Sequence, residues 1–233
     1  MNATTETPDS TAPETTEAPP PWPSARTQIR RIAERGHYDR STVEAIIDAA
    51  WHCHIAFPAG ESVHCIPTAC WREDDHLYVH GSNGSRLLKA LAEGAQVAVC
   101  ITHLDGLVLA RSAFHHSMNY RSVVIYGRFE RVPDEYKRAA LDRFVQRIGV
   151  GRELEVRPPD PTELAATTIL RISIAEAAAK IRSGGPKDDE PDFALPVWAG
   201  VLPLREQPLP ALREPDCSAE SPAYVTRWSL ATS

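Results

Sequence analysis

A change of hydrophobic period at Trp51 constrains the fold of this chain more than any other feature of its sequence. Before it, apolar residues recur at helical spacing, and Ser41 with Glu44 has the capping-box pattern, which predicts a helix over residues 41–50. After it, apolar and polar residues alternate between polar turns. Because successive side chains of a strand point to opposite faces, this alternation predicts an antiparallel meander. Its strands are expected over residues 51–57, 63–71 and 76–80.

The rest of the chain continues in short apolar segments separated by polar ones. Further strands are predicted over residues 97–102, 107–113, 121–131 and 169–174, and a last extended segment over 193–204. Helices are predicted over residues 85–93, 133–149, 162–166 and 175–181. Short strands with a few helices between them predict a mainly β fold with flanking helices, in the form of a small closed barrel.

Composition divides the chain into three parts. Residues 1–25 are rich in Thr, Pro and Glu and contain four acidic residues and no Lys or Arg, so they carry −4 of the formal net charge of −6. Such a segment buries too little apolar surface to offset the entropy of ordering, and we predict a disordered acidic tail. Residues 26–206 are expected to form one domain, and residues 207–233 a Pro-rich C-terminal extension.

Charge and hydropathy exclude several classes of protein. Subtracting the tail (−4) from the whole (−6) leaves −2, which is not the basic balance of a nucleic-acid-binding domain. The sequence has neither an apolar stretch of roughly 20 residues nor the pattern of a secretory signal, so we expect a cytoplasmic protein without a membrane span. The five cysteines are odd in number and lack CxxC spacing, which argues against a disulfide framework or a zinc site.

Residues 77–91, LYVHGSNGSRLLKAL, have the pattern of a strand that ends in a Gly/Ser/Asn turn and is followed at once by a helix. The free N–H groups and the dipole at a helix start favour a bound phosphate. Ser82 and Ser85 can donate hydroxyl hydrogen bonds, and Arg86 and Lys89 can share a helix face with Ser85. The residues alone leave two interpretations open: a phosphate site, or a well-capped helix with two solvated bases.

Four segments, taken in order, resemble the flavin-binding family of pyridoxamine-phosphate oxidase. They are HCIPTACW at 64–71, LYVHGSNGSRLLKAL at 77–91, MNYRSVVIYG at 118–127 and LPVWAGVLPL at 195–204. The combination is most similar to bacterial flavin-nucleotide-binding proteins grouped with the nitroimidazole-resistance reductases. The resemblance implies a six-stranded FMN-binding split barrel that forms a homodimer, with FMN bound in clefts at the subunit interface.

The resemblance also implies a set of site residues. Ser85 and Arg86 match the first two positions of the family's phosphate-binding Ser-Arg-Lys, and Lys89 substitutes for the third. Residues 64–69 match the strand that runs along the flavin ring. Trp198 matches a late family tryptophan that forms a wall of the flavin site, either in the same subunit or in the partner subunit. The implied cofactor-binding residues are His64, Cys65, Ile66, Pro67, Thr68, His80, Ser82, Ser85, Arg86, Lys89, Asn119, Arg121, Ser122 and Trp198.

The Arg-x-His segment with which the oxidases hold pyridoxal phosphate is absent after Trp198. The hypothesis is therefore an FMN-dependent oxidoreductase that acts on an unidentified small molecule and is not a true pyridoxamine-phosphate oxidase. His80 or His116 is the expected proton donor, because histidine titrates near neutral pH.

The alternative is a non-catalytic carrier or sensor of flavin or haem, and F420 is a further substitute for FMN. His52 and His54 share a strand face, and His64 on the next strand could approach them, which makes a metal or haem site conceivable. Histidines satisfied within the barrel are the simpler interpretation, and no metal site is predicted.

Overall fold

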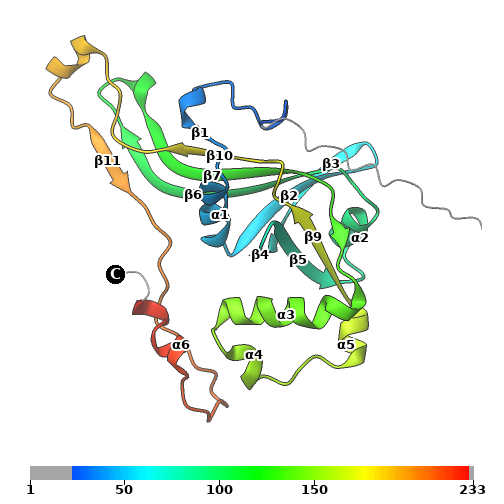
Figure 1. Ribbon diagram of the computed structural model, residues 1–233. Coiled ribbons are helices and arrows are strands. Elements are labelled where there is room, and N and C mark those ends of the chain that lie inside the picture. The colour runs from blue at the N-terminus through cyan, green and yellow to red at the C-terminus, as the bar shows by residue number, and fades with distance from the viewer. Residues whose placement is uncertain (1–22, 231–233) are drawn as a thin grey trace, which may run out of the picture.

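The computed structural model describes residues 23–230, which form two antiparallel sheets with helices packed around them (Figure 1). The larger sheet has the order β1-β10-β7-β6-β2-β3, with β11 paired to β6 beside this path, and the smaller has the order β4-β5-β9-β8. The strands of the larger sheet are β1 (Gly36–His37), β2 (His52–Ala59), β3 (Ser62–Ala69), β6 (Val97–Leu109), β7 (Ser117–Gly127), β10 (Ala177–Arg182) and β11 (Gly200–Pro203). Those of the smaller are β4 (Trp71–Glu73), β5 (His76–Ser82), β8 (Glu130–Arg131) and β9 (Thr167–Ser173).

Helices connect these strands and follow the last of them. The α-helices are α1 (Arg40–Asp48), α2 (Arg86–Ala92), α3 (Asp134–Ile148), α4 (Arg152–Glu155), α5 (Pro161–Ala166) and α6 (Ala223–Thr226). Short 3-10 helices are η1 (Ala33–Arg35), η2 (Ala113–His115), η3 (Glu190–Ala194) and η4 (Trp228–Leu230). No helix in this described range is long and apolar enough to span a membrane.

The main core lies between the two sheets. On β2, Cys53, Ile55 and Phe57 are buried whereas His52 and His54 are exposed, as expected for a strand with one face in the core. Strands β6, β7 and β10 contribute buried residues to the same cluster, and β5 and β9 contribute from the smaller sheet. Apolar residues of α1 and α2 complete it, so both helices are fixed relative to β2.

α3 covers the face of the smaller sheet that points away from this core. A second buried cluster contains Trp71, Tyr78 and Ile169 from the sheet and Ala140 from α3. The predicted boundaries of the helix are confirmed, since Pro133 precedes its first residue and Gly149 follows its last. The smaller sheet is therefore packed on both faces.

β6 and β7 extend past the core as a long hairpin at one end of the molecule (Figure 1). β11 pairs with residues 106–109 of β6, and an ion pair of 2.8 Å between Arg111 and Asp188 holds the segment before η3 to the hairpin. We call residues 104–118 and 190–204 the arm. Its exposed large apolar residues are Leu104, Leu107, Phe114, Met118, Phe193, Leu195, Val197, Trp198, Leu202 and Leu204.

The Pro-rich C-terminal extension returns to the domain. Tyr224 of α6 packs on the backbone of Gly149, and its hydroxyl donates to Glu155 at 2.6 Å. The rings of Trp228 and Trp51 lie 5.9 Å apart between centroids. The extension therefore contacts the ends of α1 and α3. At the other terminus, residues 1–22 of the predicted tail lie outside the described residues.

The predicted fold class, mainly β with flanking helices, is confirmed. The strands do not form the predicted closed barrel of six strands. The chain leaves the larger sheet at Cys70 and enters the smaller one as β4, so the predicted meander is divided between two sheets. The two sheets face each other across the core without joining into a continuous barrel.

Three predicted elements are corrected. Residues 177–182 are strand β10 and not a helix, because they pair with β7 along their whole length. The two strands predicted over 97–102 and 107–113 are one strand, β6, with a register shift between Leu104 and Gly106. α1 is capped by Asp39, whose carboxylate accepts from the Thr42 N–H at 2.9 Å, and not by Ser41.

Candidate functional site

The turn between β5 and α2 is held by its own hydrogen bonds. The Ser85 hydroxyl accepts from the N–H of Leu88 at 3.4 Å and so caps α2, and the Ser82 hydroxyl accepts from the N–H of Gly84 at 3.2 Å. Asn83 donates to the carbonyl of Ala165 at 2.7 Å, which fixes the turn to the end of α5. Both serine hydroxyls keep their own protons for donation. The predicted strand, turn and helix are therefore present, with two hydroxyl donors at the helix start.

Arg86 and Lys89 border a surface depression of about 610 Å³, which they share with the β2–β3 turn. Both side chains are exposed, and neither has a hydrogen-bond or ion-pair partner in the described part of the chain. Glu93 is the one carboxylate among the residues that line this depression, so it has an excess of positive charge. Two unpaired cations beside two hydroxyl donors can bind a phosphate.

β3 begins at this depression and forms an edge of the larger sheet. It pairs with β2 along its whole length, and within residues 23–230 no strand pairs with its other edge. Val63 is 79% exposed, and Cys65 is also exposed. Alternate residues of the strand therefore direct their C=O groups, and their N–H groups except at Pro67, toward the edge that β2 does not cover, as the predicted ring-binding strand requires.

His80 lies on the face of the smaller sheet that α3 covers. Its ring is 5.7 Å from that of Trp71 and 4.5 Å from that of Phe144 between centroids. Burial lowers the pKa of His80, and its Nδ1 atom is buried without a hydrogen-bond partner in the described range. Burial therefore favours the neutral form of His80, which packs under α3, away from Arg86 and Lys89.

The predicted trio of Asn119, Arg121 and Ser122 does not form one surface. Arg121 makes two hydrogen bonds to Asp105, at 2.9 and 3.0 Å, and this partner raises its pKa. Ser122, adjacent on β7, points to the opposite face and donates to the carbonyl of Lys180 at 3.3 Å. Asn119 is buried against Arg182 and donates to the carbonyl of Gly184. All three side chains have protein partners within the same chain.

His116 and Trp198 belong to the arm, where His116 Nδ1 lies 3.0 Å from the Ser112 carbonyl oxygen and Trp198 is 61% exposed. β11, which follows Trp198, lies at the opposite end of the molecule from α2 (Figure 1). Within one chain the structure therefore separates both residues from Arg86 and Lys89.

The outer face of the larger sheet is a surface that the sequence alone did not define. His52 and His54 are exposed on it, with ring centroids 5.5 Å apart, and neither has a hydrogen-bond partner in the described residues. Their neighbours in register across the strands are the small residues Ala69, Pro67 and Cys100. His64 is not with them, because it pairs with Phe57 and stacks on that ring at 5.6 Å on the other face. Register was the missing information, because it decides which small residues flank the histidines.

No group of three or more His, Cys, Asp or Glu side chains within residues 23–230 is placed to hold a metal ion. Two buried thiols, Cys53 and Cys70, interact with each other, which raises the pKa of Cys53. The candidate site therefore consists of three separate parts: the depression at Arg86, the edge of β3, and the histidine-bearing outer face.

Comparison with known proteins identifies relatives along most of the chain. Residues 39–181 match the model of the pyridoxamine 5'-phosphate oxidase family. The solved structure of the flavocytochrome Anf3 from Azotobacter vinelandii is 39% identical, has a TM-score of 0.85, and aligns over 88% of this chain and 97% of its own. An FAD and haem binding protein from Mycobacterium smegmatis is 37% identical, has a TM-score of 0.81, and aligns over 84% and 97%.

A putative 5-nitroimidazole antibiotic resistance protein from Bacteroides thetaiotaomicron shares the fold, with 20% identity and a TM-score of 0.52 over 63% of this chain and 86% of its own. No curated protein sequence is significantly similar. The resemblance inferred from the four sequence segments is confirmed by the family match. The chain belongs to the pyridoxamine 5'-phosphate oxidase family.

Proposed function

We propose that this chain is a redox protein that binds a flavin, with the flavin phosphate at Arg86 and Lys89 and the ring along β3. One observation carries the proposal: within residues 23–230, two cations without partners line a depression at the β2–β3 turn, and the outer edge of the strand that follows this turn pairs with no other strand. The cations neutralise phosphate charge, and the strand edge offers N–H and C=O groups to the polar rim of a planar ring. A bound flavin supplies electron and hydride transfer, while the protein binds and orients it.

FAD is the form of flavin that we propose, in place of the FMN expected from the sequence. The mycobacterial relative, which is 37% identical, is named for FAD. The depression is open and large enough, at about 610 Å³, for a phosphate to enter with further groups attached. Chromatography of the nucleotide released on denaturation distinguishes FAD from FMN.

We further propose that the outer face of the larger sheet binds haem through His52 or His54. Of the two more similar solved relatives, one is named an FAD and haem binding protein and the other a flavocytochrome. Imidazole is a common ligand of haem iron, and these two rings are exposed and without hydrogen-bond partners in the described chain. The small residues beside them leave room for a flat group against the sheet.

The proposed flavin site is completed by a second copy of this chain. Trp198 lies on the arm, away from α2, so it can wall the flavin of another subunit but not that of its own. The exposed apolar residues of the arm provide the contact surface that such a homodimer needs.

Purified protein tests the flavin. An absorbance band at about 450 nm is expected for bound flavin. Arg86→Ala is expected to lose most of it while the circular dichroism spectrum is unchanged, because a phosphate ligand is removed from an exposed position. Arg131→Ala, at an exposed position on β8, is the matched control and should keep its flavin. A colourless wild type, or full occupancy in Arg86→Ala, would contradict the proposal.

Haem and turnover are tested separately. Replacing both His52 and His54 by Ala should remove the Soret band and leave the flavin absorbance, whereas His76→Ala should keep both. A Soret band that survives the double replacement places the haem elsewhere.

Anaerobic bleaching by NADPH, followed by reoxidation with a nitro compound, is the result expected of an oxidoreductase and not of a carrier.

A further inference from the structure

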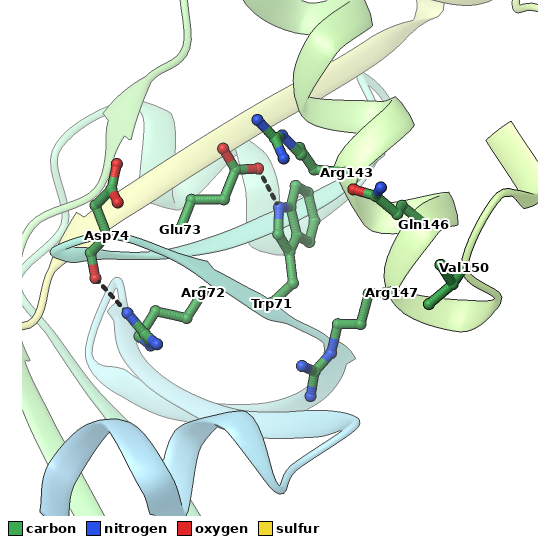
Figure 2. Close-up of a pocket in the computed structure, with 8 residues that line it drawn as sticks. All are labelled: Trp71, Arg72, Glu73, Asp74, Arg143, Gln146, Arg147 and Val150. Carbon is green, nitrogen blue, oxygen red and sulfur yellow. Dashed lines mark hydrogen bonds between the residues drawn. The ribbon is translucent and has the colours of Figure 1, made fainter. Parts of the chain in front are cut away.

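A second cavity lies between β4 and α3, apart from the proposed flavin and haem sites. It has a volume of about 540 Å³ and is lined by residues 71–74 on one side and by four residues of α3 and the turn after it on the other. Figure 2 shows Arg143 and Gln146 projecting from one helix toward Trp71, whereas Arg147 extends from the same helix past Trp71 and away from Arg143. No lining residue is shared with the depression at Arg86.

The arginines of this cavity differ in their partners. Arg72 is neutralised, because its guanidinium makes two hydrogen bonds to the Asp48 carboxylate at 2.6 and 2.9 Å. Arg147 has no carboxylate partner among the described residues. It donates to the carbonyls of Asp48 and Ala50 and lies over the Trp51 ring, 5.0 Å from its centroid. Arg143 is exposed and has no partner in the described part of the chain. Two of the three guanidinium groups therefore lack a counter-ion among residues 23–230.

A further polar side chain of the cavity is also without a partner. The Gln146 amide has no hydrogen bond to another described residue. The acidic side chains lie on the β4 side, where Glu73 accepts from the Trp71 indole N–H at 2.8 Å and Asp74 is exposed. The α3 side thus presents positive charge and amide donors, and the β4 side presents acceptors.

We propose that this cavity binds a small organic phosphate, with the phosphate at Arg143 and Gln146 and hydroxyl groups of the ligand toward Glu73 and Asp74. Side chains at positions i and i+3 of a helix share one face, so the Arg143 guanidinium can donate two hydrogen bonds to phosphate oxygens and the Gln146 amide a further one. The carboxylates opposite accept from hydroxyls and repel a second anion. This arrangement favours a sugar phosphate or a mononucleotide over inorganic phosphate.

Titration calorimetry on the protein with its native cofactors tests the site, with AMP, ribose 5-phosphate and inorganic phosphate as probes. We expect an organic phosphate to bind, and Arg143→Gln to weaken it by about tenfold or more, since hydrogen bonds to charged groups are lost. Arg138→Gln is the matched control on the same helix, because Arg138 is already paired with Asp142.

Three results would overturn this assignment. They are binding of inorganic phosphate only, no binding of any probe, and equal affinity in wild type and Arg143→Gln. Arg86→Ala separates this site from the flavin site: the variant should bind the organic phosphate normally even where its flavin is lost. If Arg86→Ala removes phosphate binding and Arg143→Gln does not, the phosphate belongs to the flavin depression and the present site is wrong.

Discussion

At the scale of single residues, Asp39 shows how one carboxylate supports an element. It accepts hydrogen bonds from the N–H of Thr42 and the hydroxyl of Ser41, and the bonding to Thr42 lowers its pKa from 3.8 to about 2. A depressed carboxylate pKa contributes stability that is present above the unfolded pKa and is lost as the pH falls through the folded one. The cap is therefore expected to weaken under acid conditions only.

Asp39→Ala should lower the urea midpoint at neutral pH, because the first turn of α1 loses an acceptor. The difference from wild type should shrink as the pH falls from about 4 to about 2, because wild type then loses its ionised cap as well. Glu61→Ala, in the exposed β2–β3 turn, is the control and should show no such pH dependence. A difference that stays constant across this range would show that the charge of Asp39 has no role.

Residue spacing in the sequence predicts the cap of α2, but it does not predict the cap of α1 or the ion pair between two strands. The Ser85 cap follows from local sequence, because a turn and an apolar helix face leave one candidate. At α1 the segment DRSTVE contains three residues of types that favour N-caps, and the capping-box pattern pointed to Ser41; only the extended backbone at Asp39, with ψ of 137°, identifies Asp39 as the cap. The ion pair between Arg121 and Asp105 joins neighbouring strands across 16 positions, and it depends on the register of β6 with β7. Local patterns do not contain that register.

At the scale of elements, β10 shows tertiary contacts overriding propensity. Its alanines favour a helix in isolation, yet Ala177 and Ala179 are fully buried where β10 lies between β1 and β7. The core covers one face of this strand and leaves little volume for its side chains, so alanine fits there where a larger residue would not. The amphipathic helix α3 and the β2–β3 hairpin, in contrast, were predictable, because their apolar periods are strong and their ends have clear turn residues.

The docking of α6 depends on the absence of a side chain at Gly149. A Cβ atom at this position would lie 2.7 Å from the Tyr224 ring, so Gly149→Ala should displace the C-terminal extension. The expected result is cleavage by trypsin at Arg213 that is several times faster than in wild type, with the thermal midpoint of the core little changed.

Gly185→Ala is the matched control for this displacement, since a Cβ there meets no atom within 4 Å. It should leave the rate of cleavage at Arg213 unchanged. Equal cleavage rates in wild type and Gly149→Ala would mean that the extension is held by other contacts, such as that between Trp228 and Trp51.

At the scale of the whole molecule, the proposed flavin site has two parts, the phosphate side at Arg86 and Lys89 and the wall formed by Trp198. The sequence alone could define the first part better than the second. The phosphate side lies within one strand, turn and helix, so its residues could be proposed from their spacing in the sequence. The position of the wall depends on the course of the arm, which runs to the other end of the subunit (Figure 1). A local pattern names Trp198 but cannot say which chain's flavin it covers.

Mixing two defective chains tests whether each site draws on two subunits. Arg86→Ala and Trp198→Ala are each expected to lose flavin as homodimers. In a dimer of one chain of each kind, a site built from two subunits pairs the intact Arg86 of one chain with the intact Trp198 of the other. One of the two sites is then complete and the other has both defects.

Refolding the two variants together, with one carrying an affinity tag, should recover flavin in about half of the sites of the mixed dimer. No recovery would show that each site is built within a single chain, and a monomeric wild type would contradict the dimer itself.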